Sequence, residues 1–240
     1  MDMNEFENKL MNYANKIGFN ITKEQTERFF EYMKLLLEWN EKINLTAITE
    51  PNEIIIKHFI DSITINKYIR ENAKVIDVGS GAGFPGIPLS IVKNDVNMTL
   101  VDSLNKRTIF LNEVKKELRL KNVNVIHGRA EELGHNIDYR EQFDIATSRA
   151  VAPLNILLEY LMPFIKVGGY CVCMKGSNIE EELIDAKKAL QELSGEIVNI
   201  DRFDLPETDY GRNIIVIRKI GNISNKYPRK PGTPSKEPLK

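Results

Sequence analysis

From Lys74 onward, short apolar runs alternate with segments in which apolar residues recur every three or four positions. The short runs predict β-strands at residues 74–78, 97–102, 122–128, 142–148, 168–175 and 213–220. The segments between them predict helices at residues 87–94, 104–120, 153–165 and 179–193. Strands that alternate with helices are typical of an α/β fold with a doubly wound, mostly parallel sheet. Residues 196–205 are expected to add an edge strand in an antiparallel hairpin, with Gly211 in its turn.

The first 72 residues follow a helical pattern instead. Residues 4–19 carry an apolar stripe that ends beside Gly18. Thr22 and Gln25 form a capping-box pattern at the start of a helix over residues 22–43, and residues 50–69 predict a third helix. We therefore expect an N-terminal helical extension (1–72), a main domain (73–222) and a C-terminal tail (223–240).

Composition narrows the class of protein. The 240-residue chain is 42% hydrophobic and 28% charged, with a formal net charge of −1, which is typical of a globular protein. No run approaches the ~20 apolar residues of a membrane span, and the acidic N-terminus is unlike a signal peptide. Cys171 and Cys173 are expected to be buried free thiols, and scarce cysteine fits a reducing compartment. We therefore expect a cytoplasmic protein without a metal site.

The last sixteen residues differ from the rest of the chain. They carry five basic side chains and one acidic one, and they hold four of the ten prolines. Proline at this density excludes a long helix, so we expect an extended or disordered segment. The basic charge is a local feature typical of nucleic-acid binding. Composition alone leaves a frayed tail and a functional tail as alternatives.

The stretch KVIDVGSGAGFPGIPLS (Lys74–Ser90) leads from a strand through Gly79, Gly81 and Gly83 into a helix. Glycine allows a sharp turn and lets a ligand approach the backbone closely. Phe84 replaces the third glycine of the dinucleotide pattern G-x-G-x-x-G, and no Gly-Lys-Ser/Thr follows as in a P-loop. The loop therefore favours a ligand without a phosphate, such as S-adenosylmethionine, over a nicotinamide dinucleotide.

Residues near the neighbouring strand ends support a nucleoside ligand. Asp102 ends the second strand, where a carboxylate can accept both ribose hydroxyls; a helix cap is the structural alternative. Asp77 precedes the glycines and could hold backbone N–H groups or the ligand's ammonium group. Ala130 and Glu131 follow the third strand, where an adenine would lie; a plain helix start, with Glu favoured by the helix dipole, is the alternative.

The fourth strand ends in Ser148-Arg149-Ala150, at the position that faces the methyl acceptor in methyltransferases. The Asn/Asp-Pro-Pro-aromatic run of enzymes that methylate adenine amino groups is missing here. Both cysteines lie inside a strand, not in a loop where a cytosine C5 methyltransferase carries its nucleophile. Nothing specific points to the base that ribose methylation needs. An acceptor with a free lone pair, such as guanine N7, needs no base, and alignment alone could promote the transfer.

Seven short runs, spread over nearly the whole chain, carry a resemblance to a known family. They are Asn44–Ile48, Lys57–Ser62, Asp77–Leu89, Gly128–Glu132, Ser148–Leu154, Met174–Gly176 and Tyr227–Leu239. The chain resembles the bacterial 16S rRNA guanine-N7 methyltransferases (RsmG), also called glucose-inhibited division protein B (GidB). The resemblance implies a Rossmann-like S-adenosylmethionine-dependent methyltransferase fold with an N-terminal helical extension. It also implies methylation of N7 of a guanine in the 530 loop of 16S rRNA.

The resemblance further implies site residues. Cofactor contacts carry over to Gly79, Phe84, Ala130, Glu131 and Arg149, and the logic of the fold adds Asp102. The basic residues Arg129, Lys175 and Arg212 fall on family positions that could hold a phosphate or the guanine, and the sequence identifies no catalytic residue beyond these candidates.

The resemblance also bears on the tail and on partners. Lys226, Arg229 and Lys230 could follow an RNA backbone, or the tail could pack back over the cofactor pocket. His58 could stack on a base, although a histidine on an apolar helix face is more often part of the core. We expect 16S rRNA or the small ribosomal subunit as partner, no membrane partner, and a monomer.

Three other functions stay open at this point. A small-molecule methyltransferase would explain residues 74–220 but not the basic tail. Phe84 argues against a nicotinamide-dependent oxidoreductase. The intact glycine loop and Asp102 argue against a non-enzymatic RNA-binding protein that keeps a vestigial fold.

Overall fold

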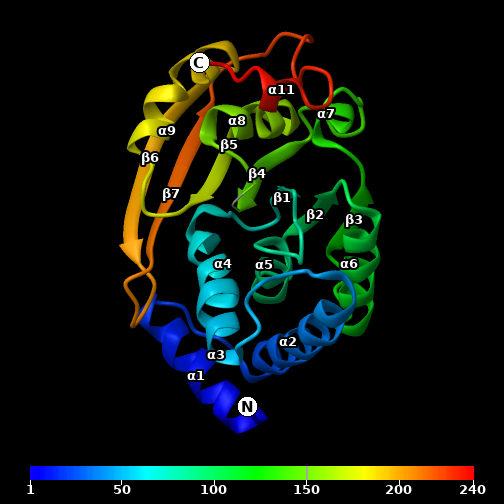
Figure 1. Ribbon diagram of the computed structural model, residues 1–240, viewed down its shortest axis with the longest axis vertical. Helices are drawn as coiled ribbons and strands as arrows, with labels where there is room; N and C mark the ends of the chain where they lie inside the picture. The colour runs from blue at the N-terminus through cyan, green and yellow to red at the C-terminus, as the bar shows by residue number, and fades with distance from the viewer. Residues whose placement is uncertain (150) are drawn as a thin grey trace.

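The computed structural model describes residues 1–149 and 151–240, so Ala150 of the Ser148-Arg149-Ala150 run lies outside the described residues. Seven strands form a sheet in the order β3-β2-β1-β4-β5-β7-β6 (Figure 1). The strands are β1 (Lys74–Val78), β2 (Asn97–Asp102), β3 (Val123–His127), β4 (Phe143–Arg149), β5 (Ile165–Lys175), β6 (Gly195–Asp204) and β7 (Gly211–Lys219). The first five are parallel, and β7 runs antiparallel between β5 and β6. The chain order reverses beside β1, where open α/β sheets bind their ligands.

Two of the predicted strands, β5 and β7, need small corrections at their first residues. The antiparallel hairpin is confirmed, but Gly211 is the first residue of β7 and not part of the turn. Strand β5 begins at Ile165, earlier than predicted, because its pairing with β4 is irregular: Phe143 pairs with Ile165, whereas Ile145 pairs with Tyr170. Gly168, with φ +87°, lies in this irregular stretch, which the apolar pattern could not identify as strand.

Helices cover both faces of the sheet, as the alternating pattern predicts. Helices α5 (Gly86–Val92) and α6 (Asn105–Glu117) contribute to a core on one face. Helices α8 (Leu154–Leu161) and α10 (Lys187–Glu192) contribute to a second core on the other face, and α7 (Ala130–Leu133) follows β3. The predicted helix over 179–193 is divided at Ala186 into α9 (Glu180–Asp185) and α10. The predicted helix over 153–165 ends as a 3₁₀ turn, η3 (Met162–Phe164).

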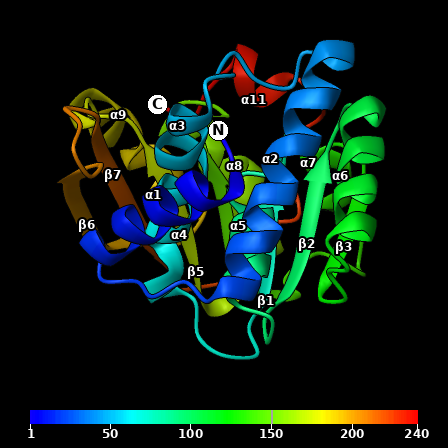
Figure 2. The same cartoon turned by 90° about the horizontal axis from the view of Figure 1, so that it is seen from below.

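The first 70 residues are helical, and they pack into the same core as α5 and α6. Figure 2 shows α1 (Met3–Lys16) and α2 (Lys23–Ile43) lying across this side of the molecule. The predicted capping box is present, since Thr22 Oγ1 accepts from Gln25 N at 3.2 Å and Gln25 Oε1 accepts from Thr22 N at 2.9 Å. The predicted third helix changes its winding along its length. It consists of α3 (Pro51–Ile54), a π-helical turn η1 (Ile55–Ile60), α4 (Asp61–Ile63) and a 3₁₀ turn η2 (Thr64–Tyr68).

Two predictions about single segments are resolved by burial. Cys171 and Cys173 are free, buried thiols on β5, as predicted. Of the two alternatives for the C-terminal tail, a frayed segment is excluded, because Tyr227 and Leu239 are buried in the second core and residues 233–236 form a short helix, α11 (Thr233–Lys236). In the part of the chain that the structure describes, no helix is both long and apolar enough to cross a membrane.

Candidate active site

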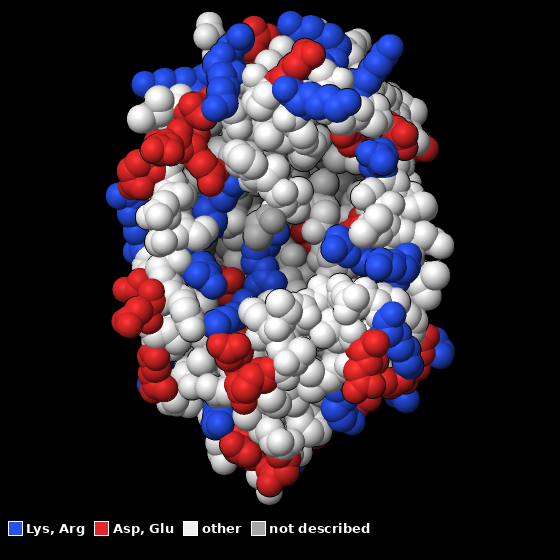
Figure 3. Space-filling view, in the orientation of Figure 1, with Lys and Arg blue, Asp and Glu red and all other residues white. Residues whose placement is uncertain are grey.

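Three adjoining cavities lie at the carboxyl ends of the parallel strands. The loop cavity, about 410 Å³, is lined by Gly79–Ala82, Phe84, Asp102 and Arg149. The strand-tip cavity, about 190 Å³, is lined by Val78, Asp102, Ala130, Glu131 and Tyr160. The outer chamber, about 570 Å³, is lined by Lys57, Asp61, Arg149, Lys175 and Arg212. Val151 lines all three, and Figure 3 shows the hollow on this face with basic side chains at its margin.

The glycines of the loop have different structural roles. Gly79, Gly81 and Gly83 all have positive φ, between +60° and +98°. A Cβ on Gly79 would lie 2.7 Å from Val151 Cγ2, and one on Gly83 would lie 2.6 Å from Ile87 Cγ1. A Cβ on Gly81 would meet no atom closer than Gly79 O at 3.9 Å. Packing therefore requires Gly79 and Gly83, whereas Gly81 leaves open space on the cavity side, as close approach of a ligand requires.

Two buried acids flank the loop. Asp102, 2% exposed, accepts hydrogen bonds from the N–H groups of Gly81 and Leu104, both at 2.9 Å, and from Arg107 Nη1 at 3.4 Å. A carboxylate offers about four acceptor positions, so Asp102 keeps one position on Oδ1 for a ligand hydroxyl group. Asp77 Oδ2 accepts from Gly86 N at 3.0 Å, so this acid holds a backbone N–H group at the end of the loop. Its Oδ1 is buried and has no partner among the described residues.

An aromatic wall closes the loop cavity on the side of the N-terminal helices. The Tyr32 hydroxyl donates to Ala82 O, and the Tyr32 and Phe84 ring centroids are 5.5 Å apart. His58 stacks on Phe84, with ring centroids 4.4 Å apart, and the Arg149 guanidinium lies 4.8 Å from the centre of the same ring. The expectation that His58 belongs to the core is confirmed by its burial, but the same side chain also lines the loop cavity and the outer chamber.

His58 Nδ1 lies between a donor and an acceptor, because Arg149 Nη2 is 3.1 Å away and Lys57 O is 3.2 Å away. Arginine can only donate, so the contact with Arg149 favours the tautomer in which Nδ1 accepts and Nε2 donates to Thr46 Oγ1 at 2.9 Å. Burial, together with the nearby charge of Arg149, lowers the pKa of His58 to about 3. The imidazole is therefore neutral at physiological pH.

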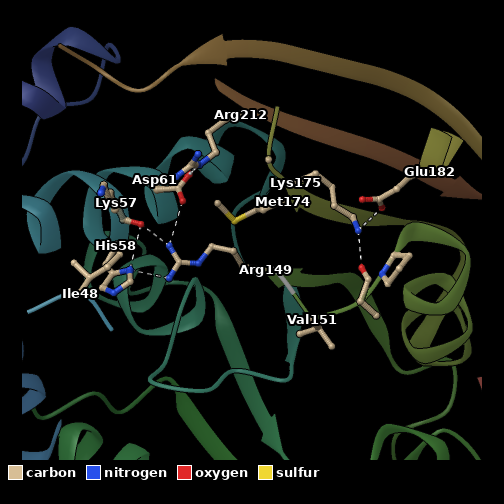
Figure 4. A pocket seen from close by; sticks show the side chains of 13 residues that line it. Ile48, Lys57, His58, Asp61, Arg149, Val151, Met174, Lys175, Glu182 and Arg212 are labelled. Atoms are coloured by element: carbon tan, nitrogen blue, oxygen red, sulfur yellow. Dashed lines mark hydrogen bonds and ion pairs between the residues drawn. The ribbon is translucent and has the colours of Figure 1, made fainter. Parts of the chain in front are cut away.

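Asp61 connects two arginines across the outer chamber (Figure 4). Its Oδ2 accepts from Arg149 Nη1 at 3.2 Å and its Oδ1 from Arg212 Nε at 3.1 Å. The Asp61 side chain is 4% exposed. Sequence analysis did not identify Asp61 as a site residue, although it lies in the Lys57–Ser62 run. Its partners are 88 and 151 residues away along the chain, and no local pattern indicates such pairs.

A second ion pair lies on the opposite wall of the chamber, as Figure 4 shows. Lys175 Nζ lies 2.6 Å from Glu182 Oε2 and donates to Ala152 O at 2.6 Å. Glu182 Oε2 also accepts from Leu154 N at 2.8 Å. Sequence analysis missed Glu182, which appeared there only as part of the predicted helix over residues 179–193.

The structure places the predicted cofactor residues in the loop and strand-tip cavities and two of the three basic candidates in the outer chamber. Gly79, Phe84, Asp102 and Arg149 line the loop cavity, while Ala130, Glu131 and Asp102 line the strand-tip cavity. Of the three basic candidates, Lys175 and Arg212 line the outer chamber together. Arg129 lies apart from them, at the strand-tip cavity. Among residues 1–149 and 151–240, no group of three His, Cys, Asp or Glu side chains could hold a metal ion.

Asp77 and His58 should both make the folding stability of the ligand-free protein depend on pH, in opposite directions. Burial raises the pKa of Asp77 from 3.8 to about 7, so its contribution to folding stability is complete below pH 4 and is lost as the pH rises through 7. The lowered pKa of His58 acts in the other direction, because its contribution is present above pH 6.5 and is lost as the pH falls toward 3. Each shift corresponds to roughly 4 kcal/mol of unfolding free energy.

Urea unfolding of the wild type, Asp77→Asn and His58→Gln between pH 4 and 7 tests this expectation. As the pH rises, the wild type should lose stability relative to Asp77→Asn and gain it relative to His58→Gln. Parallel pH profiles for all three proteins would contradict it.

The sheet order and the helices on both of its faces give this chain the fold of the S-adenosylmethionine-dependent methyltransferases. Its solved structural neighbours include an S-adenosylmethionine-dependent methyltransferase from Aquifex aeolicus (TM-score 0.53, 18% identity, 70% of this chain and 94% of that chain). Another is TYW2 from M. jannaschii in complex with S-adenosylmethionine (TM-score 0.51, 17% identity, 67% and 77%).

Sequence relatives identify the family. Residues 25–214 match the GidB family, rRNA small subunit methyltransferase G. The chain is 53% identical over 231 residues to ribosomal RNA small subunit methyltransferase G of Acetivibrio thermocellus, covering 96% of this chain and 95% of the relative. It is 50% identical over 227 residues to the protein of the same name from Alkaliphilus metalliredigens, covering 94% and 95%. The chain belongs to this family.

Proposed function

We propose that this enzyme transfers a methyl group from S-adenosylmethionine to N7 of a guanine in the 530 loop of 16S rRNA. The names of its relatives support a small-subunit rRNA substrate. The family resemblance of the sequence supports the N7 atom and the 530 loop. On this proposal the enzyme works in the cytoplasm, on the small ribosomal subunit or on its RNA.

The observation that carries the N7 assignment is that the acids and the imidazole lining the outer chamber already accept hydrogen bonds from the protein. Asp61 already accepts from two arginines, Glu182 from Lys175, and the His58 Nδ1 lone pair from Arg149. A chamber whose described acids and imidazole are engaged in this way suits an acceptor that needs no proton removed. Guanine N7 has a free lone pair, so positioning and alignment can supply much of the rate.

The chamber walls match the edges of a guanine. Guanine O6 is an acceptor that suits the cationic groups of Arg149, Arg212 and Lys175, while the N7 lone pair beside it must stay free to attack the methyl group. The N1–H and N2–H₂ donors on its other edge suit a carboxylate, and Glu182 is the one beside Lys175. The loop cavity and the chamber share His58, Arg149 and Val151, so an acceptor in the chamber would face the loop cavity directly.

The cofactor fits the two inner cavities. When bound, S-adenosylmethionine supplies an electrophilic methyl group. Asp102 would accept a ribose hydroxyl, and Ala130 and Glu131 would lie beside the adenine. Gly81 would allow close approach to the backbone, and Phe84 and Arg149 would border the methionine portion.

Methyl transfer from labelled S-adenosylmethionine to small subunits, and to naked 16S rRNA, from cells lacking this enzyme tests the proposal. Borohydride and aniline treatment then cleaves at N7-methylguanine. We expect one cleavage, in the 530 loop. Label in the rRNA without cleavage would overturn the N7 assignment, and cleavage elsewhere would overturn the 530 loop. Cofactor binding without any RNA labelling would favour a small-molecule acceptor.

A further inference from the structure

We propose that the C-terminal segment, residues 225–239, is a strap that completes the strand-tip cavity and sets the affinity for the adenosine part of the cofactor. The inference deepens the proposed function, since it assumes that this cavity holds the adenosine. It does not depend on the identity of the RNA substrate. Three sets of contacts carry it.

The first set anchors the strap to α8. The carboxylate of Glu159, which is fully buried, accepts from Arg229 N at 2.7 Å, Nε at 2.9 Å and Nη2 at 2.7 Å. A buried carboxylate is costly unless it is paired and fully hydrogen-bonded, and Arg229 meets that requirement. The guanidinium of Arg229 is thus committed to the protein interior and not to an RNA backbone.

The second set holds the strap against the loop that follows α7. Arg140 Nη1 donates to Tyr227 O at 2.8 Å, and His135 Nε2 lies 2.6 Å from Pro228 O. A Cβ on Gly134 would lie 2.8 Å from Pro228 Cγ, so the absence of a side chain at Gly134 lets the two segments pack closely.

The third set reaches the cavity wall itself. Gly232 N donates to Glu131 Oε1 at 3.1 Å, and Ser235 Oγ lies 3.0 Å from the Tyr160 hydroxyl. Glu131 and Tyr160 both line the strand-tip cavity, together with Asp102. Figure 1 shows α11 beside α7 and α8, the helices that carry these two residues.

These contacts make the strap a positioning element for the cofactor site. Glu131 and Tyr160 belong to separate short helices, and the strap bonds to both. Arg229 also holds Glu159, the residue next to Tyr160 in α8. A wall fixed before the ligand arrives loses less conformational entropy on binding, so fixing it raises affinity. By linkage, bound adenosine must stabilise the docked strap in return.

The test compares Arg229→Met with a matched control, Lys219→Met. The Lys219–Glu141 pair, at 2.7 Å, likewise has one fully buried member, which here is the lysine, and Lys219 lines none of the three cavities. Calorimetry would give the Kd of S-adenosylmethionine and of adenosine for each protein, and thermal unfolding would give the loss of stability. We expect about a tenfold or larger rise of both Kd values in Arg229→Met only, with a lower unfolding temperature in both variants.

Two other outcomes would contradict the proposed role of the strap, and a third would bear only on the RNA substrate. Unchanged Kd values in Arg229→Met, with the unfolding temperature lowered as in Lys219→Met, would make the segment purely structural. Weaker rRNA binding with unchanged Kd values would make it an RNA contact. Wild-type protein that binds S-adenosylmethionine but not 16S rRNA would contradict the proposed substrate and leave the strap intact.

A milder pair of measurements applies if Arg229→Met does not fold. Ser235→Ala removes only the contact with Tyr160 and should raise the Kd of adenosine a few-fold. Adenosine should also slow tryptic cleavage after Lys226 and Lys236 of the wild type. Absence of both effects would overturn the proposal.

Discussion

The variant Asp61→Asn is expected to lose about 100-fold or more in kcat/KM for methyl transfer, because small displacements of positioning groups cost rates of this order. Asp61 is the anion between the guanidinium groups of Arg149 and Arg212, and Arg149 borders both the cofactor and the acceptor side of the site. Asparagine keeps the shape of the side chain but leaves two neighbouring cations without their shared counter-charge. We also expect about 3 kcal/mol of lost stability, because breaking a buried ion pair leaves an uncompensated charge.

A control for this variant is Asp144, at the other end of β4 from Arg149. Asp144, near the start of β4, pairs with Arg70 at 2.6 Å and with Lys166 at 3.5 Å, far along the strand from Arg149. Asp144→Asn should leave kcat/KM within about a factor of two of the wild type, because Asp144 is remote from the three cavities and lines none of them. Steady-state kinetics on the small subunit, with Kd values for the cofactor, give both comparisons. Equal losses of kcat/KM in the two variants would show that Asp61 has no special role.

The second large effect is expected for Gly81→Asp, which should raise the Kd of S-adenosylmethionine about 100-fold or more while the protein stays folded. Gly81 has φ +60°, a conformation that Asp and Asn tolerate better than other residues, and its surroundings leave room for a Cβ. The new carboxylate would enter the loop cavity beside Asp102, which already bonds to Gly81 N. Two carboxylates at close range repel each other, and one of them takes up a proton or is displaced.

Gly81→Asn separates charge from bulk in this experiment. The amide has the same shape and carries no charge, so a smaller rise of the Kd is expected than in Gly81→Asp. Calorimetric titration of the cofactor into both variants, with circular dichroism spectra to verify folding, gives the comparison. Wild-type affinity in Gly81→Asp would remove the assignment of Gly81 to the cofactor site.

Sequence reasoning predicted the parts of the site that are local in the chain. The glycine loop, Asp102 and Ala130–Glu131 each follow a strand directly, and parallel strands bring their carboxyl ends to the same edge of the sheet. The pairs Asp61–Arg149 and Arg229–Glu159 were missed, because each joins elements that become neighbours only in the folded chain. The pair Lys175–Glu182 joins two consecutive elements, and it was missed because it depends on the turn between β5 and α9. Glu159 in particular lies in an apolar helix, and nothing in its local pattern distinguishes a buried acid from an exposed one.

Two differences in secondary structure have a similar cause. The run Ile54–Ile56 followed by Phe59–Ile60 is buried almost completely, and an apolar run of this kind does not reveal whether the winding is α or π. For the tail, composition correctly excluded long regular elements. It could not predict docking, which depends on Tyr227, Leu239 and the buried partner of Arg229.

The aromatic wall of the loop cavity limits how the parts of this enzyme can be exchanged. Phe84 comes from the glycine loop, whereas Tyr32, His58 and Phe59, which pack around it, come from the N-terminal helices. Tyr32 also bonds to the loop backbone at Ala82. A chimera that carries only the glycine loop, or only residues 73–222, would lack the aromatic side chains of the N-terminal helices that pack against Phe84. The transferable unit is therefore the loop together with the N-terminal helices, and these two segments must vary in concert among functional relatives.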